Sequence, residues 1–280
     1  MRHVSEFPES SLACYLVDRL AAGRLVFSRD EAQLALRMSR GAFLGAAERL
    51  QKRHRLLNLT RSLYVIVPPQ HLHVGSPPPA SFIDELMRHE NRSYYVGLLN
   101  AAELQGASHQ AIDLQVVAKP QMREVLRAGP SKIVFYFRND MSAIESGIEE
   151  RKTDTGKMNI SSIELTLLDL LRYPRASGGL DTILTVFSDL GPKLNPERME
   201  VVAHAFERSV LQRVGHLLDR SGFAKHAEKL QPLIHRPFAS QMVWVELYPL
   251  PSSDPDLAPE IQALDERWQV LIRRNPERDE

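Results

Sequence analysis

Hydrophobic and polar residues follow first a helical and then an extended pattern between residues 28 and 67. Residues 28–36 and 40–53 place apolar side chains every three or four positions, which predicts two helices joined by a tight turn. Arg55–Leu59 and Leu63–Val67 are short apolar runs around a polar triplet. This second pattern predicts a two-stranded hairpin directly after the helices.

Helix-capping residues mark where these helices begin. Ser28 is a good N-cap, and the acids that follow it, Asp30 and Glu31, favour the positive end of the helix dipole. Ser39 precedes the second helix in the same way. A further helix, from about Glu9 to Ala22, is expected to cover the pair with Leu12, Leu16, Val17 and Leu20. Three helices followed by a hairpin are typical of a winged helix-turn-helix, which can place a helix in a DNA groove.

The second helix of the pair carries cations opposite its apolar face. At about 100° per residue, one face holds Phe43, Ala46, Ala47 and Leu50, while Gly41, Gly45, Arg49 and Lys52 point broadly away. The outward face suits a phosphate backbone, although an ordinary amphipathic surface helix has the same pattern. Arg61 at the hairpin tip favours DNA, because it can reach a phosphate or the minor groove. The residues predicted to contact DNA are Ser39, Arg40, Arg49, Lys52, Arg53 and Arg61.

Charge is distributed unevenly along a chain of zero net charge. Residues 1–75 hold 11 Lys and Arg against 6 Asp and Glu, and the remainder holds 24 against 29. A basic head on an acidic body is what a nucleic-acid-binding module would show. The single cysteine, Cys14, excludes an intrachain disulfide and fits a reducing compartment. We find no signal-peptide pattern and no apolar run near the ~20 residues that span a bilayer, so we expect a cytoplasmic protein away from membranes.

A proline-rich segment separates the basic head from the rest of the chain. Residues 68–80 contain five prolines, which disfavour both helices and central strands. We therefore expect a DNA-binding domain at residues 1–68, a semi-rigid linker at 69–80 and a larger domain at 81–280. His71 and His73 form an HxH pair in this linker, but further ligands would be needed for a metal site.

The larger domain should be mixed α and β, which makes the whole chain an α+β protein. Ser161 and Glu164 have capping-box spacing, and Asn195 followed by proline and glutamate is a strong helix start. The expected helices are 93–105, 161–173 and 195 to about 218, with Gly106 and Gly222 ending the first and last. The expected strands are 112–118, 132–137, 242–248 and 268–272.

Motifs for catalysis are absent, so we predict no catalytic residue, cofactor or metal. The chain contains no GxxxxGK[ST], GxSxG, HExxH or CxxC motif. Asp113, Gln115 and Lys119 are the kind of groups that hold a metal and a water in nucleases, but their spacing is loose and a second carboxylate is missing. A nucleic-acid-processing defence enzyme with a DNA-targeting head remains an alternative, as does a ligand-sensing transcription regulator.

Several segments together resemble the AbiEi-type antitoxins. RSLY at 61–64 resembles the family's RGxY wing, and YYVGLLNAAELQG at 94–106 is similar to its YYVGLLSALELHG segment. Four further blocks follow in family order: VVAKPQMR at 116–123, NISSIELTLLDLLRYPRASGG at 159–179, VLQRVGHLLDRSG at 210–222 and RWQVLIRRN at 267–275. Ser62 is a departure, because the family usually has glycine there, which puts the turn type of the hairpin in doubt.

The resemblance implies a two-domain antitoxin that also represses its own operon. Its winged helix would bind inverted repeats in promoter double-stranded DNA, as a dimer on that DNA. Its larger domain would oppose a nucleotidyltransferase toxin encoded beside it, in an abortive-infection or type IV toxin–antitoxin system of phage defence. In that type a stable complex with the toxin is not required.

Overall fold

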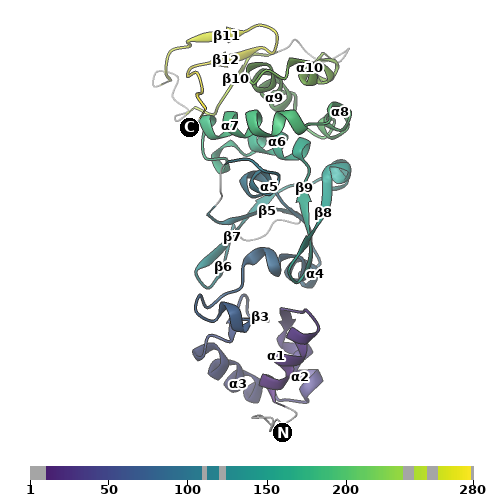
Figure 1. The fold of residues 1–280 in the computed structure, drawn as a ribbon, viewed down its shortest axis with the longest axis vertical. Helices are drawn as coiled ribbons and strands as arrows, with labels where there is room; N and C mark the ends of the chain where they lie inside the picture. The colour runs from purple at the N-terminus through teal and green to yellow at the C-terminus, as the bar shows by residue number, and fades with distance from the viewer. Residues whose placement is uncertain (1–10, 109–111, 120–123, 236–242, 251–257, 279–280) are drawn as a thin grey trace. The chain divides into compact units, whose positions relative to one another are not determined.

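The computed structural model describes residues 11–108, 112–119, 124–235, 243–250 and 258–278, which fold as two compact units (Figure 1). The first unit comprises the chain up to residue 95 together with 113–139 and 150–159. The second comprises 96–112, 140–149 and residues from 160 onward. The expected boundary at 69–80 lies inside the first unit, so independent folding of residues 1–68 stays a prediction.

Three helices and a small sheet form the N-terminal part of the first unit, which we call the head (residues 11–67). Its elements are α1 (Leu12–Ala21), β1 (Val26–Ser28), α2 (Arg29–Leu36), α3 (Arg40–Lys52), β2 (Leu56–Asn58) and β3 (Leu63–Ile66). The strands lie in the order β1-β3-β2, and both pairings are antiparallel. The sequence predicted the hairpin but not β1, whose apolar Val26 and Phe27 directly precede the cap of α2.

Aromatic rings hold the head together. Tyr64 of β3 stacks on Phe27 with ring centroids 5.7 Å apart, and Phe43 of α3 meets the same tyrosine edge-on at 5.3 Å. Leu12 and Leu16 of α1 are buried against this cluster as expected. Val17 is not, because 51% of its surface is exposed, and the prediction that it covers the helix pair is wrong.

Both predicted N-caps are present, Ser28 at the start of α2 and Ser39 at the start of α3. The Ser28 hydroxyl accepts from the Glu31 amide at 3.1 Å, and the Glu31 carboxylate accepts from the Ser28 amide, which completes a capping box. The Ser39 hydroxyl accepts from the Ala42 amide at 3.3 Å. The described part of α1 begins after Ser11, and the expected start near Glu9 lies outside the described residues.

The proline-rich segment is folded onto the first unit. Two 3₁₀ turns occur in it, at Pro69–His71 and Pro79–Ser81, and Ser76 is 2% exposed. A Cβ on Gly129 would lie 3.0 Å from the Ser76 side chain, so the segment packs closely against the turn that contains Gly129. Helix α4 (Ile83–His89) follows directly.

A six-stranded sheet, in the order β6-β7-β5-β4-β9-β8, follows α4. Its strands are β4 (Ser93–Val96), β5 (Leu114–Lys119), β6 (Val125–Ala128), β7 (Ser131–Phe137), β8 (Ile148–Thr153) and β9 (Gly156–Ser161). Strands β5 and β7 confirm two predictions, but the helix expected at 93–105 is wrong in its first half. Tyr94, Tyr95 and Val96 favour a strand, and Gly97 then caps the short helix α5 (Leu98–Leu104).

The second unit is built around α6 (Ile163–Arg172), whose residues from Glu164 to Leu171 are all buried. Helices α5, α7 (Leu180–Leu190), α8 (Pro196–Ala203) and α9 (Arg208–Arg220) pack against it (Figure 1). The short helices α10 (Ala224–Ala227) and α11 (Gln231–Ile234) follow. A three-stranded sheet combines β10 (Val245–Glu246), β12 (Val270–Ile272) and β11 (Ala263–Asp265) in that order. The start of the strand expected at 242–248 lies outside the described residues, and α7 and β11 were not predicted.

Two helix boundaries differ from the expectation for local reasons. Ser162, one residue later than predicted, caps α6 by accepting from the Leu165 amide, so the expected box of Ser161 and Glu164 is wrong. Glu164 instead accepts from the Asn195 amide at 2.9 Å, which ties α6 to the start of α8. The single helix expected from Asn195 to about Leu218 is two helices separated by a turn at 204–207. This turn contains neither glycine nor proline, so the sequence pattern did not indicate it.

Candidate nucleic-acid interface

Helix α3 presents one face to the core of the head and the other to solvent. Phe43, Ala47 and Leu50 are buried, and Ala46 packs against the same cluster, which confirms the predicted apolar face. At about 100° per residue the opposite side is a stripe of Gly41, Gly45, Glu48 and Lys52. A Cβ on Gly41 would meet nothing within 4 Å, so the backbone is open to a close approach at this point.

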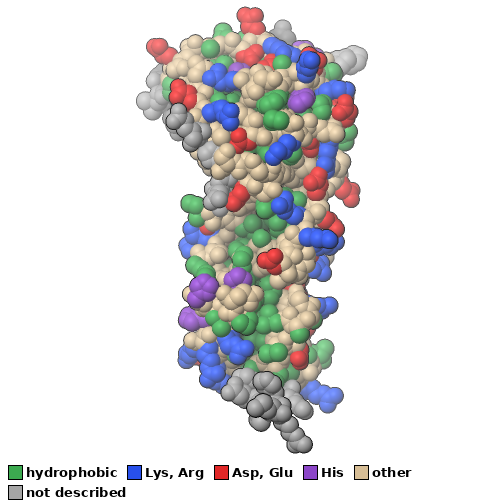
Figure 2. Space-filling view, viewed as in Figure 1, with side chains coloured by type: hydrophobic (Ala, Val, Ile, Leu, Met, Phe, Trp, Pro, Cys, Tyr) green, Lys and Arg blue, Asp and Glu red, His purple; other side chains and the backbone are tan. Residues whose placement is uncertain are grey.

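The cations expected on α3 are all exposed, but they are not equivalent. Arg49 and Arg53 point into solvent near the C-terminal end of the helix. Lys52 forms an ion pair with Glu48, with Nζ 2.8 Å from the carboxylate. Its hydrogen bond to that carboxylate lowers the pKa of Glu48. This ion pair was not predicted, although the i,i+4 spacing of Glu48 and Lys52 in a helix is typical of one. Figure 2 shows Lys and Arg side chains gathered over this part of the head, next to histidines.

The N-terminal end of α3 carries the remaining two predicted residues. Arg40, the first residue of the helix, is exposed. Ser39 is also exposed, but its hydroxyl is already engaged as the N-cap. At about 1.5 Å per residue, Arg40 lies ~14 Å along the helix axis from Arg49. At about 100° per residue the two arginines also point to opposite sides of α3, so they do not form a single cluster.

Arg61 is exposed at the tip of the β2–β3 hairpin, as predicted. The turn is held by the Thr60 hydroxyl, which accepts from the amides of Ser62 at 3.5 Å and Leu63 at 3.2 Å. Ser62 does not have a positive φ, so this turn needs no glycine at that position. The departure from the family pattern therefore leaves the hairpin intact.

Arg37 and His54 lie at helix ends and were not among the residues predicted to contact DNA. Arg37 ends α2 in the left-handed conformation with a φ of 49°, and His54 follows α3 with a φ of 53°. Both side chains are exposed. Non-glycine residues with positive φ are uncommon, and the pattern of apolar residues gives no sign of them.

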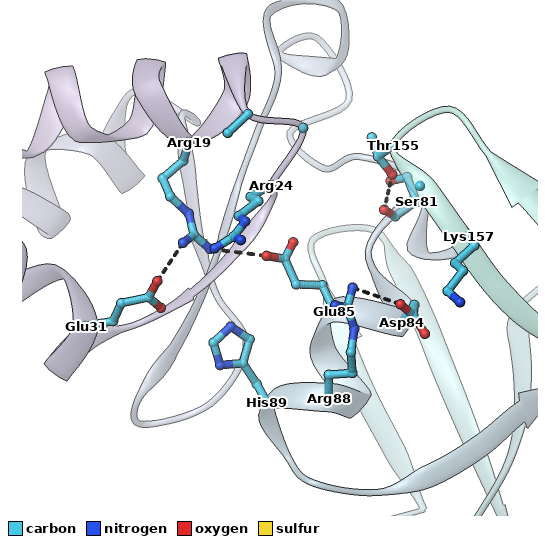
Figure 3. A pocket seen from close by; sticks show the side chains of 13 residues that line it. Arg19, Arg24, Glu31, Ser81, Asp84, Glu85, Arg88, His89, Thr155 and Lys157 are labelled. Atoms are coloured by element: carbon cyan, nitrogen blue, oxygen red, sulfur yellow. Dashed lines mark hydrogen bonds and ion pairs between the residues drawn. The ribbon is translucent and has the colours of Figure 1, made fainter.

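A buried ionic cluster joins the head to α4 within the first unit (Figure 3). The Glu85 carboxylate accepts from the amides of Leu25 at 2.8 Å and Val26 at 2.9 Å. It also accepts from Arg19 at 3.1 Å, and Arg19 reaches Glu31 of α2 at 2.6 Å. Arg19 further donates to the Val26 carbonyl. No sequence motif predicts this cluster, because its members are spread over more than sixty residues of the chain.

The residues considered for catalysis occupy structural positions. Asp113 pairs with Lys132 at 3.7 Å, and Gln115 is 8% exposed and hydrogen-bonds to Tyr136. His216, which was not among those residues, lies 2.6 Å from the Asp265 carboxylate. Within the described ranges, no three His, Cys, Asp or Glu side chains are grouped closely enough to hold a metal ion. None of the described helices combines the length and the apolar character needed to cross a membrane.

Comparisons with known proteins place these features in context. The crystal structure of the RV2827C protein from Mycobacterium tuberculosis aligns with a TM-score of 0.68 at 16% identity, covering 96% of this chain and 93% of that one. This likeness concerns the fold alone. The solution structure of the antibiotic-resistance factor ANT(2'')-Ia aligns over 49% of this chain and 94% of that one at 13% identity, with a TM-score of only 0.31. No curated protein matches the sequence significantly.

A family model gives a more specific match. It covers residues 95–220, which extend from the end of β4 to the end of α9 and include the buried helix α6. Four of the six sequence blocks that carried the resemblance fall within or overlap this range, at 94–106, 116–123, 159–179 and 210–222. Residues 95–220 match the AbiEi antitoxin C-terminal domain, which confirms the resemblance to the AbiEi-type antitoxins.

Proposed function

We propose that this protein is a transcriptional repressor and antitoxin that regulates its own operon and counters a cognate nucleotidyltransferase toxin. In this proposal the head is a winged helix-turn-helix that binds inverted repeats in promoter DNA, with two protein copies on each repeat. The second part of the proposal gives residues 81–280 the antitoxin role. No catalytic residue is assigned.

The observation that carries the proposal is an AbiEi antitoxin domain on the same chain as the head. The match at 95–220 supports an antitoxin and DNA-binding regulator in general terms, as part of a toxin–antitoxin system. The head adds the order helix, strand, helix, helix, hairpin, with an exposed cationic face on α3. This element order supports DNA binding through α3 and the β2–β3 turn.

The positions of the cations suggest different roles for them. Arg40 lies at the N-terminal end of α3, the end that usually meets base edges in a helix-turn-helix. Arg49 and Arg53, at the other end, are placed to contact phosphates. Arg61 would contact a phosphate or the minor groove from the hairpin tip. Lys52 should contribute less, because Glu48 already offsets its charge.

Binding to the protein's own promoter tests the DNA-binding part. Fluorescence anisotropy with a labelled promoter duplex should give an affinity that falls with salt, with a log–log slope of about −0.9 per phosphate contact. Arg49→Gln should weaken binding and reduce the magnitude of this slope by about 0.9. Arg127→Gln, the same change at an exposed arginine of β6, is the matched control and should leave both unchanged. Equal losses for the two variants would exclude a specific role for α3.

Base preference separates Arg40 from Arg61. Arg40→Ala should relax discrimination between promoter variants by ~1–3 kcal/mol at the affected base pair, whereas Arg61→Ala should weaken all sequences alike. Competition between labelled and unlabelled promoter variants measures both effects. An equal loss of affinity for every promoter variant in Arg40→Ala would show that Arg40 contacts only a phosphate.

Growth rescue tests the antitoxin part. The full chain is co-expressed with the product of the neighbouring reading frame, and it should restore growth if that product is its toxin. Arg49→Gln should still rescue growth while failing to repress a promoter reporter, because the proposal assigns the two activities to different parts of the chain. Failure of the unaltered chain to rescue growth would refute the antitoxin assignment for this pair.

A further inference from the structure

A polar cavity of about 440 Å³ lies within the first unit, beside the buried ionic cluster (Figure 3). The end of α1, helix α4 and the turn between β8 and β9 line it. Its volume falls in the range of small-molecule sites. Its polar lining includes the cations Arg24, Arg88 and Lys157, the imidazole of His89, and the acids Glu31, Asp84 and Glu85.

The three acids of the cavity have no free acceptor oxygen. Glu85 accepts from Arg19 with one oxygen and from two backbone amides with the other. Asp84 accepts from the Tyr94 hydroxyl at 3.0 Å with one oxygen and pairs with Arg88 through the other at 2.9 Å. Glu31 is occupied in the same way by Arg19 and its own capping box. These carboxylates are therefore committed to the fold and do not need a ligand cation.

The cations of the cavity have unused donors. Within the described residues, the side chains of Arg24 and His89 have no hydrogen-bond or ion-pair partner, and both are exposed. The Arg88 side chain is 73% exposed despite its pair with Asp84, and that of Lys157 is 55% exposed despite its pair with Glu150. Arg24 and His89 therefore offer side-chain donors that no described group occupies, and Arg88 and Lys157 each keep further N–H donors beside the one that is paired.

Two further features prepare the cavity for a ligand. Gly23 and Gly156 have φ values of +70° and +153°, and a Cβ on Gly156 would meet nothing within 4 Å. Backbone without side chains can approach a bound group closely. The Arg19 side chain is 10% exposed and its Nε has no partner among the described residues. A nine-tenths buried donor without an acceptor at the cavity wall is a second sign that an acceptor is missing.

We propose that this cavity binds a small phosphate-bearing molecule of about nucleotide size, with its phosphate held by Arg24, Arg88 and Lys157 and assisted by His89. Arginine forks match the geometry of phosphate oxygens, and lysine adds a point charge. The polar walls disfavour an apolar ligand. This site is separate from α3 and the hairpin tip, so it stands independently of the proposed DNA binding.

Calorimetric titration of the full chain tests the site without DNA. Pyrophosphate and adenosine monophosphate are the probes, and adenosine is the uncharged control. Both phosphate probes should bind and adenosine should not. Arg24→Gln should weaken binding about tenfold, as expected for loss of one charge-assisted contact of ~1.4 kcal/mol, and should not affect folding because that side chain has no described partner. Arg127→Gln serves again as the matched control and should bind as the unaltered protein does.

Three results would overturn the proposal. The first is no binding of either phosphate probe at millimolar concentration, and the second is equal binding of adenosine. The third is an Arg24→Gln variant that binds both phosphate probes as tightly as the unaltered chain does. If the first result is accompanied by weaker promoter binding of Arg24→Gln, the cavity cations belong to the DNA-contacting surface instead of a small-molecule site.

Discussion

The Glu85 carboxylate should be a major determinant of stability for the first unit. Its two oxygens serve three donors: the amides of Leu25 and Val26 and the guanidinium of Arg19. Glu85→Gln preserves the shape of the side chain but replaces one acceptor oxygen with an NH₂ donor and removes the charge. At least one of the three donors must then face another donor.

The size of the effect follows from these contacts. A hydrogen bond to a charged group contributes about 1.5–3 kcal/mol, and a buried donor without an acceptor costs ~1–3 kcal/mol. The Glu85 side chain is 18% exposed, so water can replace part of what is lost. We therefore expect the free energy of unfolding to fall by about 2–4 kcal/mol, with the loss centred on β1.

Urea unfolding and amide hydrogen exchange measure the two aspects of this prediction. The amides of Leu25 and Val26 should exchange at least about tenfold faster in Glu85→Gln, since ~1.4 kcal/mol of local stability corresponds to a factor of ten. Glu90→Gln at the opposite end of α4 is the control with the same chemical change, because the described partner of that carboxylate, Arg92, lies 4.0 Å away. A Glu85→Gln variant with unchanged exchange at both amides and a stability loss no larger than that of Glu90→Gln would refute the reasoning.

Three further predictions concern packing, pH and the hairpin turn. Gly215→Ala would place a Cβ about 2.3 Å from the Trp268 ring and should cost ~1–3 kcal/mol in urea unfolding. Gly41→Ala, at an open helix position, should instead stabilise the protein by up to ~1 kcal/mol. A change of the same sign in the free energy of unfolding of both variants would contradict the packing argument. Burial raises the pKa of Tyr94, so its contribution to stability is intact below pH ~10 and is lost above it, as the unfolded tyrosine ionises. Tyr94→Phe should therefore make the decline in the free energy of unfolding between pH 9 and 11 shallower by up to about 1.4 kcal/mol per pH unit. An unchanged slope would show that Tyr94 ionises normally. Ser62→Gly should not stabilise the protein and should cost up to ~1 kcal/mol, because Ser62 lacks a positive φ; an increase in the unfolding midpoint would mean that the turn is strained.

Local chemistry explains the parts of the fold that could be read from the sequence. Ser28, Ser39 and Asn195 cap helices at the predicted positions, because an N-cap contact spans only three residues and needs no distant partner. The β2–β3 hairpin and the apolar face of α3 are equally local. The exposure of the predicted α3 and hairpin residues followed from the same periodicity, while their role in DNA binding remains a proposal.

The failures occur where nearby alternatives compete. Ser161 and Ser162 are both plausible caps for α6, and Ser162 is used because Glu164 is drawn to the Asn195 amide in the tertiary structure. Ser93–Val96 fits an apolar helix or a strand, and pairing in the six-stranded sheet selects the strand. Such choices depend on partners that are remote in sequence, which periodicity cannot identify.

The sequence by itself determined the capped helices, the hairpin, the basic head and, through its family blocks, the antitoxin resemblance. Only the tertiary structure decided that Glu85 joins α4 to the edge of β1, and that a polar cavity lined by Arg24, Arg88 and Lys157 lies beside this contact. The physical reason is the sequence separation between the residues that contact each other. Caps and turns are settled by neighbours within about four residues. The Glu85 contacts instead join residues about sixty positions apart, so they exist only once the chain has folded.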